Sequence, residues 1–362
     1  MLVESNYMGR CSTKIDSLYS DGFILPQEGV LDGSIVDSIA ERILVHVRNK
    51  EEHPIYKKHS VRDWHLVYPE LVEFILHDKV LSQLKSVLGE DLILWRSHVF
   101  YKPPNTGSIG WHQDFGTFSG EDIGNNKISL LPSHISSITE ESLSSYLYEA
   151  MCQSAPQSAP DHTPFWNMTV WVALSDITYD MGPLRFVPGS HRKRYPVRMR
   201  ELSESDFWQN PFANITNKEE LINACRDSKL VLDLDTSNLL KETDIDQHSY
   251  GELKQAILLK LKQLKGSTTL VEELSSEDVA SFPMSKGSYM LFSERTLHGS
   301  NANKTERERL AINFRITNSR TLVYPSRLRG DFIDGFNINI QDHKCILLSG
   351  RNLNDKNQVD RV

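Results

Sequence analysis

Short segments with the hydrophobic pattern of β-strands limit this chain to a few folds. They recur between residues 92 and 317, and turn-forming Gly, Pro and Asn residues bound them. The expected strands are Leu92–Tyr101, Gly110–Phe115, Met168–Leu174, Leu184–Val187, Ser288–Phe292 and Leu310–Thr317. Several short strands with long helical insertions favour a β-barrel or jelly roll over a doubly wound sheet.

Helical patterns lie before and between these strands. Apolar residues follow helical spacing in Ser34–Val47 and again in Leu71–Leu88, after which Gly89 is suited to end a helix. We expect these helices to pack on the outside of a sheet, in an α+β fold with a mainly β core. Two insertions interrupt the strands: residues 119–164, a candidate lid with a helix near residues 142–152, and residues 205–285, which are largely helical. No linker or internal repeat divides the 362 residues, so a single domain is expected.

Charge and composition disfavour several kinds of partner. The chain has 40 Lys and Arg residues against 48 Asp and Glu, a net charge of −8, which argues against binding nucleic acid through phosphate neutralisation. The sequence shows no signal-peptide pattern and no long apolar segment, so we expect neither secretion nor a membrane span. Four scattered Cys residues without a CxxC pair fit a reducing compartment. The expected location is the cytoplasm, and the oligomeric state stays open.

His112 and Asp114 form the first pattern that suggests chemistry. At positions i and i+2 of a strand, an imidazole and a carboxylate point to the same face and can bind one metal ion. Such a pair also arises by chance, and alone it is more often structural than metal-binding.

A second pattern, in the C-terminal half, favours the metal site. His298 follows an apolar segment and Arg309 begins the returning strand, so a hairpin brings the two side by side. Two His and one carboxylate leave adjacent metal positions open, as in non-haem Fe(II) oxygenases. A 2-oxo acid and O2 would fill those positions, and the distal carboxylate of the acid needs a bidentate cation. Arg309 fits this need, and Arg307 is the competing candidate.

The segments around these residues resemble the phytanoyl-CoA dioxygenase family of Fe(II)- and 2-oxoglutarate-dependent oxygenases. The matching segments are Ser20–Ile24, Tyr101–Pro104, Trp111–Phe115, Val170–Asp176, Met181–His191, Thr296–Ser300 and Cys345–Gly350. The resemblance implies a double-stranded β-helix core of the jelly-roll or cupin-like type. It also implies Fe(II), 2-oxoglutarate and O2 as cofactors.

The same resemblance assigns roles to individual residues. His112, Asp114 and His298 match the catalytic iron ligands, and Arg309 matches the partner of the 2-oxoglutarate C5 carboxylate. Ser300 and Trp171 match residues around the cosubstrate. Thr169, on the same strand face as Trp171, is a weaker candidate for cosubstrate binding.

Further residues on these strands have two interpretations. His98, Phe100 and Lys102 occupy alternate strand positions, so they either bind substrate at the barrel mouth or pack as ordinary strand residues. Arg315 shares the parity of Arg309, and an inward arginine needs either a structural salt bridge or a substrate carboxylate. Histidines in turns or insertions are not expected to be ligands: His134, His162 and His191.

The expected activity is oxidation of an unactivated C–H bond in a small molecule, amino acid-like or an intermediate of secondary metabolism. Hydroxylation, desaturation and oxidative cyclisation all fit, with release of succinate and CO2. One alternative is an acyl-CoA hydroxylase of the phytanoyl-CoA type, which the lack of an evident basic cluster for CoA phosphates disfavours. A non-catalytic barrel that binds 2-oxoglutarate and a zinc hydrolase are also compatible with the two His and one Asp. Arg309, however, has no role in a hydrolase.

Overall fold

The computed structural model describes most of the chain. The described residues are 14–114, 118–119, 127–131, 165, 167–192, 195, 198–201, 212, 215–226, 239–241, 243–265, 267–270, 274, 278–334 and 338–361. Most of the insertion expected at 119–164, with its predicted helix and with His134 and His162, lies outside the described residues.

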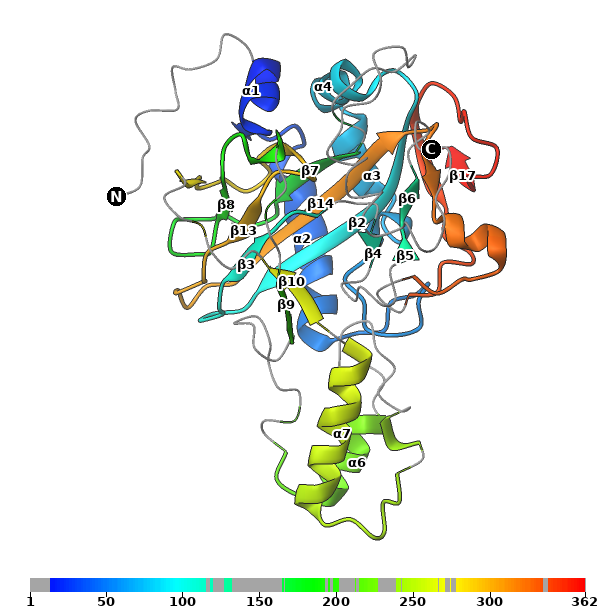
Figure 1. Ribbon diagram of the computed structural model, residues 1–362. Coiled ribbons are helices and arrows are strands. Elements are labelled where there is room, and N and C mark those ends of the chain that lie inside the picture. Colours follow the sequence, from blue (N-terminus) through cyan, green and yellow to red (C-terminus); the bar gives the residue numbers. More distant parts are fainter. Residues whose placement is uncertain are drawn as a thin grey trace.

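Two β-sheets face each other and form the core, as expected for a jelly roll (Figure 1). The larger sheet has the order β1 (Phe23–Gln27), β12 (Tyr289–Ser293), β7 (Asn167–Ala173), β14 (Arg309–Asn318), β2 (Leu92–Lys102), β16 (Cys345–Ser349) and β17 (Val359–Arg361). The smaller sheet has the order β11 (Ala280–Ser281), β8 (Leu184–Phe186), β13 (His298–Ser300) and β3 (Ile109–His112). Neighbouring strands are antiparallel except for the parallel pair of β16 and β17. The predicted α+β fold with a mainly β core is confirmed.

Helices cover the outer face of the larger sheet. Those that precede β2 in the chain are α1 (Lys14–Asp21), α2 (Gly33–Asn49), α3 (Glu70–Leu76) and α4 (Asp78–Leu88). The apolar stripe of α2, including Ile39 and Ile43, belongs to one buried cluster with Val172 of β7 and Ile312 of β14. Burial of such side chains removes apolar surface from water and holds the helices on the sheet.

The segment Leu71–Leu88, expected to be helical throughout, is divided into α3 and α4. The break is at His77, whose ψ of 129° is not helical and whose Nδ1 accepts a hydrogen bond from the backbone N–H of Lys79. Capping by a side chain replaces the hydrogen bond that a continuous helix would have made there. Gly89 ends α4 with a φ of 87°, as its position predicted.

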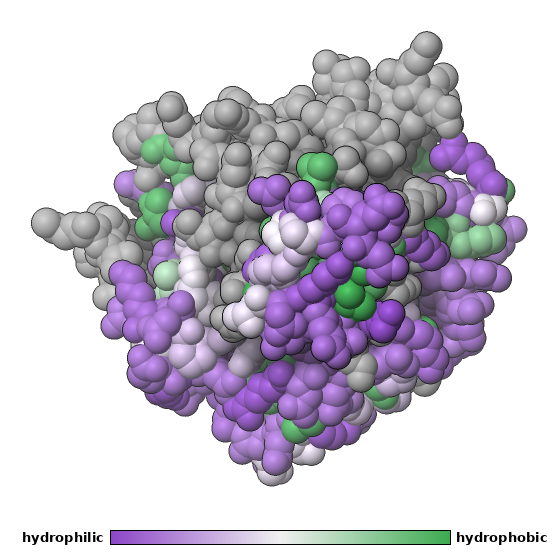
Figure 2. Space-filling view, turned by 90° about the horizontal axis from the view of Figure 1, so that it is seen from below, coloured by the Kyte–Doolittle hydropathy of each residue, from purple (hydrophilic) through white to green (hydrophobic). Residues whose placement is uncertain are grey.

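The second insertion forms a small helical unit of its own. Helices α6 (Lys218–Arg226) and α7 (Tyr250–Lys265) bury a separate cluster that includes Leu221, Leu253 and Ile257, and they project away from the sheets (Figure 1). Strand β10 (Ser267–Leu270) then pairs with β9 (Arg198–Glu201), so the insertion is not helical throughout. Viewed from that side, the described surface is mostly hydrophilic, with separate hydrophobic spots (Figure 2).

The C-terminal segment closes one side of the barrel. Strand β15 (Leu322–Val323) pairs with β6 (Leu130–Leu131), and β4 (Phe118–Ser119) pairs with β5 (Lys127–Ile128) nearby in the sequence.

Among the described helices, none is both long and apolar enough to cross a bilayer.

The inner face of the larger sheet is where the predicted site residues meet. In the β14–β2 ladder, Arg309 pairs with Lys102, Ala311 with Phe100 and Asn313 with His98. In the β14–β7 ladder, Asn313 pairs with Trp171 and Arg315 with Thr169. Because directly paired residues project to the same side of a sheet, this register gathers these side chains on one surface.

Candidate active site

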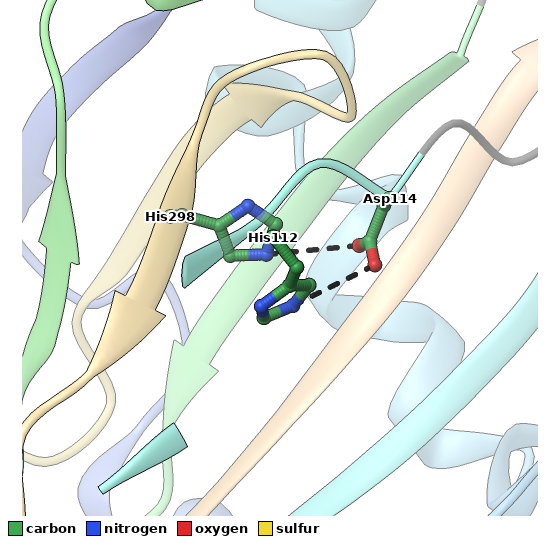
Figure 3. Close-up of side chains that lie close together, drawn as sticks. All are labelled: His112, Asp114 and His298. Atoms are coloured by element: carbon green, nitrogen blue, oxygen red, sulfur yellow. Dashed lines mark ion pairs between the residues drawn. The ribbon is translucent and has the colours of Figure 1, made fainter. Parts of the chain in front are cut away.

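Three predicted ligand residues converge between the two sheets. The Nε2 atom of His112 lies 3.8 Å from Oδ1 of Asp114, and Nε2 of His298 lies 3.7 Å from Oδ2 (Figure 3). One possible ligand atom from each residue lies within 4.8 Å of the other two, and this is the metal-competent group found in the described part of the chain. The spacing suits a single ion held by two imidazoles and a carboxylate.

Strand pairing brings the two histidines together. His112 ends β3 and lies directly opposite His298 of β13, with ring centroids 4.3 Å apart. Gly299 permits the strands to approach, because a Cβ atom there would be only 2.6 Å from the carbonyl oxygen of Ile109. Asp114 lies two residues beyond the end of β3, not within a continuous strand to Phe115 as expected. Its backbone N–H instead donates to the carbonyl of Glu294, 2.9 Å away.

Backbone carbonyls orient both imidazole rings. Nδ1 of His112 is 2.8 Å from the carbonyl oxygen of Gly110, and Nδ1 of His298 is 2.8 Å from that of Thr296. A carbonyl only accepts, so each Nδ1 donates, and an imidazole that carries its proton on Nδ1 has the lone pair of Nε2 available for a metal. Burial lowers the pKa of His298 to about 4, which favours this neutral form.

Asp114 is held as a carboxylate. Burial by itself would raise its pKa, but the positive charge of Arg315, with smaller effects of the adjacent His298 and His112, lowers it well below the usual range. Arg315 makes the closest contact: its Nη2 donates to Oδ2 of Asp114 over 2.7 Å. The inward arginine therefore has a carboxylate partner within the protein.

Arg309 lies at the other end of the same inner face. Its side chain is buried, Nη1 donates to the carbonyl oxygen of Gly182 over 3.0 Å, and the guanidinium carbon is 5.6 Å from the centre of the Trp171 ring. Among the residues that the structure describes, no carboxylate pairs with Arg309, and its Nε has no hydrogen-bond partner. Burial lowers the pKa of Arg309 to about 9. Arg307, by contrast, lies before β14 begins and is exposed.

Several more buried polar atoms in this region have no hydrogen-bond partner among the described residues. They are the hydroxyls of Ser300 and Thr169 and the amide oxygen of Asn313, all in side chains that are nearly inaccessible. An unsatisfied buried polar group costs free energy, so two hydroxyls that can donate, together with a guanidinium that has no carboxylate partner, indicate a ligand with acceptor oxygens. The amide oxygen of Asn313 instead requires a donor. A dicarboxylate such as 2-oxoglutarate fits Arg309 and Ser300, and the two histidines with Asp114 fit Fe(II).

The three predicted substrate residues on β2 differ in how far they are exposed. His98 and Phe100 are partly accessible, and their rings lie 4.7 Å apart. Burial, followed by the charges of Arg62, Arg315 and Arg96, lowers the pKa of His98 to about 3, so this ring is neutral. Lys102 is fully buried near Arg309, where Nζ donates to the carbonyls of Gly107 (2.6 Å) and Asn301 (2.8 Å).

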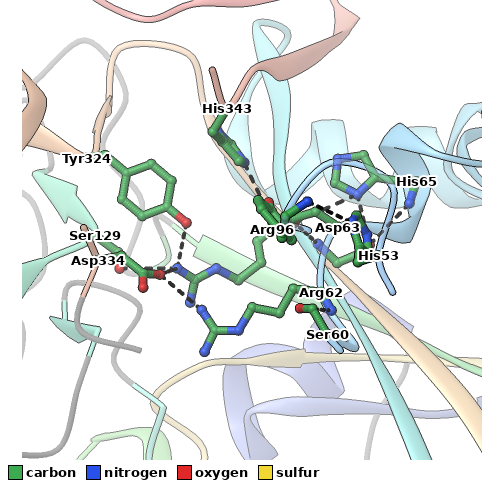
Figure 4. A network of polar contacts seen from close by, with 12 residues as sticks. His53, Ser60, Arg62, Asp63, His65, Arg96, Ser129, Tyr324, Asp334 and His343 are labelled. Carbon is green, nitrogen blue, oxygen red and sulfur yellow. Dashed lines mark hydrogen bonds and ion pairs between the residues drawn. The ribbon is translucent and has the colours of Figure 1, made fainter. Parts of the chain in front are cut away.

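A buried polar network beside His98 was not anticipated from the sequence. The backbone of Arg62 forms an isolated antiparallel β-bridge with that of His98. The side chains of Arg62 and Arg96 both contact Oδ2 of Asp334, at 3.0 and 3.3 Å (Figure 4). Arg96 also donates to the hydroxyl of Tyr324 over 2.6 Å. These partners are more than 200 residues apart in the sequence, so no local pattern could have predicted them. Asn313 was also missed, although it has the strand parity of Arg309.

The facing sheets and the His-Asp-His group define a mononuclear metal-dependent oxygenase of the jelly-roll class. The family model of phytanoyl-CoA dioxygenase matches residues 18–141 and 146–311. The chain therefore belongs to the phytanoyl-CoA dioxygenase family, and the expected class, a non-haem Fe(II)- and 2-oxoglutarate-dependent dioxygenase, is confirmed.

Individual proteins similar to this chain share only low sequence identity with it. A probable alpha-ketoglutarate-dependent hypophosphite dioxygenase of Stutzerimonas stutzeri is 27% identical over 120 residues, which cover 32% of this chain and 41% of that protein. The chain thus matches about two fifths of the length of this curated relative. The structure of CytC3 with Fe(II) and alpha-ketoglutarate has a TM-score of 0.55 at 16% identity, with 97% of this chain and 93% of that chain covered. The non-heme monooxygenase ThoJ has a TM-score of 0.52 at 15% identity, with 96% and 87% covered. At such identities these structures support the fold.

Proposed function

We propose that this protein couples the oxidative decarboxylation of 2-oxoglutarate to the oxidation of a C–H bond in a small molecule. The observation that carries the proposal is the buried side chain of Arg309, which has no carboxylate partner in the described structure. It lies on the same strand face as Arg315, whose partner Asp114 belongs to the His-Asp-His group. A zinc hydrolase would not need such a guanidinium.

In this proposal, His112, Asp114 and His298 hold Fe(II), which supplies the oxidising chemistry with O2 when bound. Arg309 and Ser300 bind the C5 carboxylate of 2-oxoglutarate, and Trp171 forms the wall of its pocket. Thr169 and Asn313 offer hydrogen bonds along the same face. Two imidazoles and one carboxylate leave adjacent positions for a chelating 2-oxo acid.

The roles proposed for His98, Phe100 and Lys102 are based on their positions on β2. His98, which interacts electrostatically with Arg315, and the neighbouring Phe100 are partly accessible and orient the substrate beside the metal. Lys102, paired with Arg309, adds positive charge at the cosubstrate end instead of contacting the oxidised substrate. Because His98 is neutral, it can offer one donor and one acceptor to a hydroxyl, amide or amino acid-like group.

The substrate is an amino acid-like compound or an intermediate of secondary metabolism, and the outcome is hydroxylation, desaturation or ring closure. We also propose a single oxygenase domain for residues 1–362, in the cytoplasm, with insertions at 119–164 and 205–285. A small molecule is the expected partner, and no role in binding nucleic acid is proposed.

A panel of small molecules, tested for succinate formation from 2-oxoglutarate, examines this proposal. Stimulation by one compound, lost in His298→Ala and retained in the matched surface variant His248→Ala, is the expected result. If anaerobic Fe(II) and 2-oxoglutarate produce no visible charge-transfer band with the wild-type protein, the iron and cosubstrate assignments are wrong. A band without stimulation by any compound would favour the non-catalytic barrel.

A further inference from the structure

Arg315 makes a contact that distinguishes the two oxygens of Asp114. Each oxygen is close to a different imidazole, Oδ1 to His112 at 3.8 Å and Oδ2 to His298 at 3.7 Å. The carboxylate is therefore placed to offer one oxygen or both to an ion between the rings. Nη2 of Arg315 approaches Oδ2 alone, at 2.7 Å.

The number of oxygens that Asp114 donates decides how many metal positions stay open. In a six-coordinate ion, two imidazoles and one carboxylate oxygen leave three positions, which suffice for a chelating 2-oxo acid and O2. A carboxylate that uses both oxygens leaves only two. The 2-oxo acid would then occupy both remaining coordination positions, and O2 could not bind.

The hydrogen bond from Arg315 to Asp114 lies in a largely buried environment, which strengthens it. The side chains of Arg315 and Asp114 are only 14% and 17% exposed, so a charge-assisted hydrogen bond between them is weakly screened. A guanidinium beside Oδ2 also opposes the approach of a second cation to that oxygen. The backbone N–H of Asp114, which donates to the carbonyl of Glu294, fixes the other end of the residue.

We propose that Arg315 is a positioning residue that restricts Asp114 to binding iron through one oxygen and so keeps the position for O2 open. The inference rests on the proposed function, because it takes Asp114 as an iron ligand. It assigns to Arg315 the pairing with a protein carboxylate and not the binding of a substrate carboxylate.

Nitric oxide, which occupies the position of O2 on Fe(II), tests the proposal without turnover. Anaerobic protein saturated with Fe(II) and 2-oxoglutarate is titrated with nitric oxide and followed by electron paramagnetic resonance. We expect Arg315→Met to keep the charge-transfer band of 2-oxoglutarate and to lose nitric oxide affinity by at least about tenfold. Arg315→Lys, which keeps the charge but not the planar fork, should show a smaller loss and serves if the Met variant does not fold.

Arg96→Lys is the matched control. Arg96 is the cross-strand partner of Arg315 and is also buried, but it pairs with Asp334 and Tyr324 instead of Asp114. Its variant should bind nitric oxide as the wild type does, and a loss as large as that of Arg315→Lys would overturn the proposal. Unchanged nitric oxide affinity in the Arg315 variants, or loss of the 2-oxoglutarate band, would also overturn it. Absence of that band in the wild type would instead refute the proposed function.

Discussion

His112 and His298 are direct cross-strand partners, although they are 186 positions apart in the sequence, and their ring centroids lie 4.3 Å apart. The metal site therefore depends on the register between β3 and β13. Gly299 is the residue that lets these strands lie close enough.

Gly299→Ala should reduce metal affinity by at least about tenfold, or about 1.4 kcal/mol. The added Cβ would lie 2.6 Å from the carbonyl oxygen of Ile109, so the strands must separate and the imidazoles move apart. Titration with Co(II), followed by its visible absorption, measures the affinity. Gly251→Ala, in α7 with open space around the new methyl group, is the control and should leave the affinity unchanged.

Arg309→Leu should raise the apparent KM for 2-oxoglutarate by at least about tenfold, because it removes a buried charge-assisted contact. Steady-state assays of succinate formation measure the effect, and circular dichroism checks the fold. Arg307→Leu is the matched control, since Arg307 is exposed on the same connection. An unchanged KM in Arg309→Leu would remove the cosubstrate role from this residue.

The affinity for 2-oxoglutarate should fall as the pH rises above about 7. Burial and the nearby charges of Arg309 and Arg185 lower the pKa of Lys102 to about 7, so the free enzyme loses this positive charge above that pH. An anion that binds beside Lys102 takes up a proton there, and the coupling makes binding strongest at low pH. Anaerobic titrations across this pH range measure it. Lys102→Met should flatten the profile, whereas the exposed Lys286→Met should not.

The unmodified enzyme should form no chlorinated product. Asp114 supplies a carboxylate oxygen where a halide would otherwise bind, and its negative charge disfavours a neighbouring anion. Mass spectrometry of products formed at high chloride concentration checks this, once the substrate screen has given a substrate. A chlorine isotope pattern from the wild type would contradict the oxygenase outcome, and Asp114→Ala should lose the native reaction.

The sequence alone determined the central strands of the larger sheet, β2, β7, β12 and β14, and the faces of their side chains. Period-two patterning placed Arg309, Asn313 and Arg315 on one side of β14. The exposure of Arg307 has a different cause, because this residue lies two positions before Arg309 and outside the strand. The resemblance of ordered segments predicted the family, which the match over residues 18–141 and 146–311 confirmed. Local patterning is sufficient for these predictions because each one concerns residues within one strand or one short contiguous segment.

Contacts between distant segments were decided only by the tertiary structure. The pairing of Arg315 with Asp114 joins residues 201 positions apart, and that of Arg62 with Asp334 joins residues 272 positions apart. The sequence left Arg315 with two possible partners, because an inward arginine requires a negative charge but its pattern does not specify which one. Sheet register and chain folding supplied Asp114, since only they set which buried charges come within hydrogen-bonding distance.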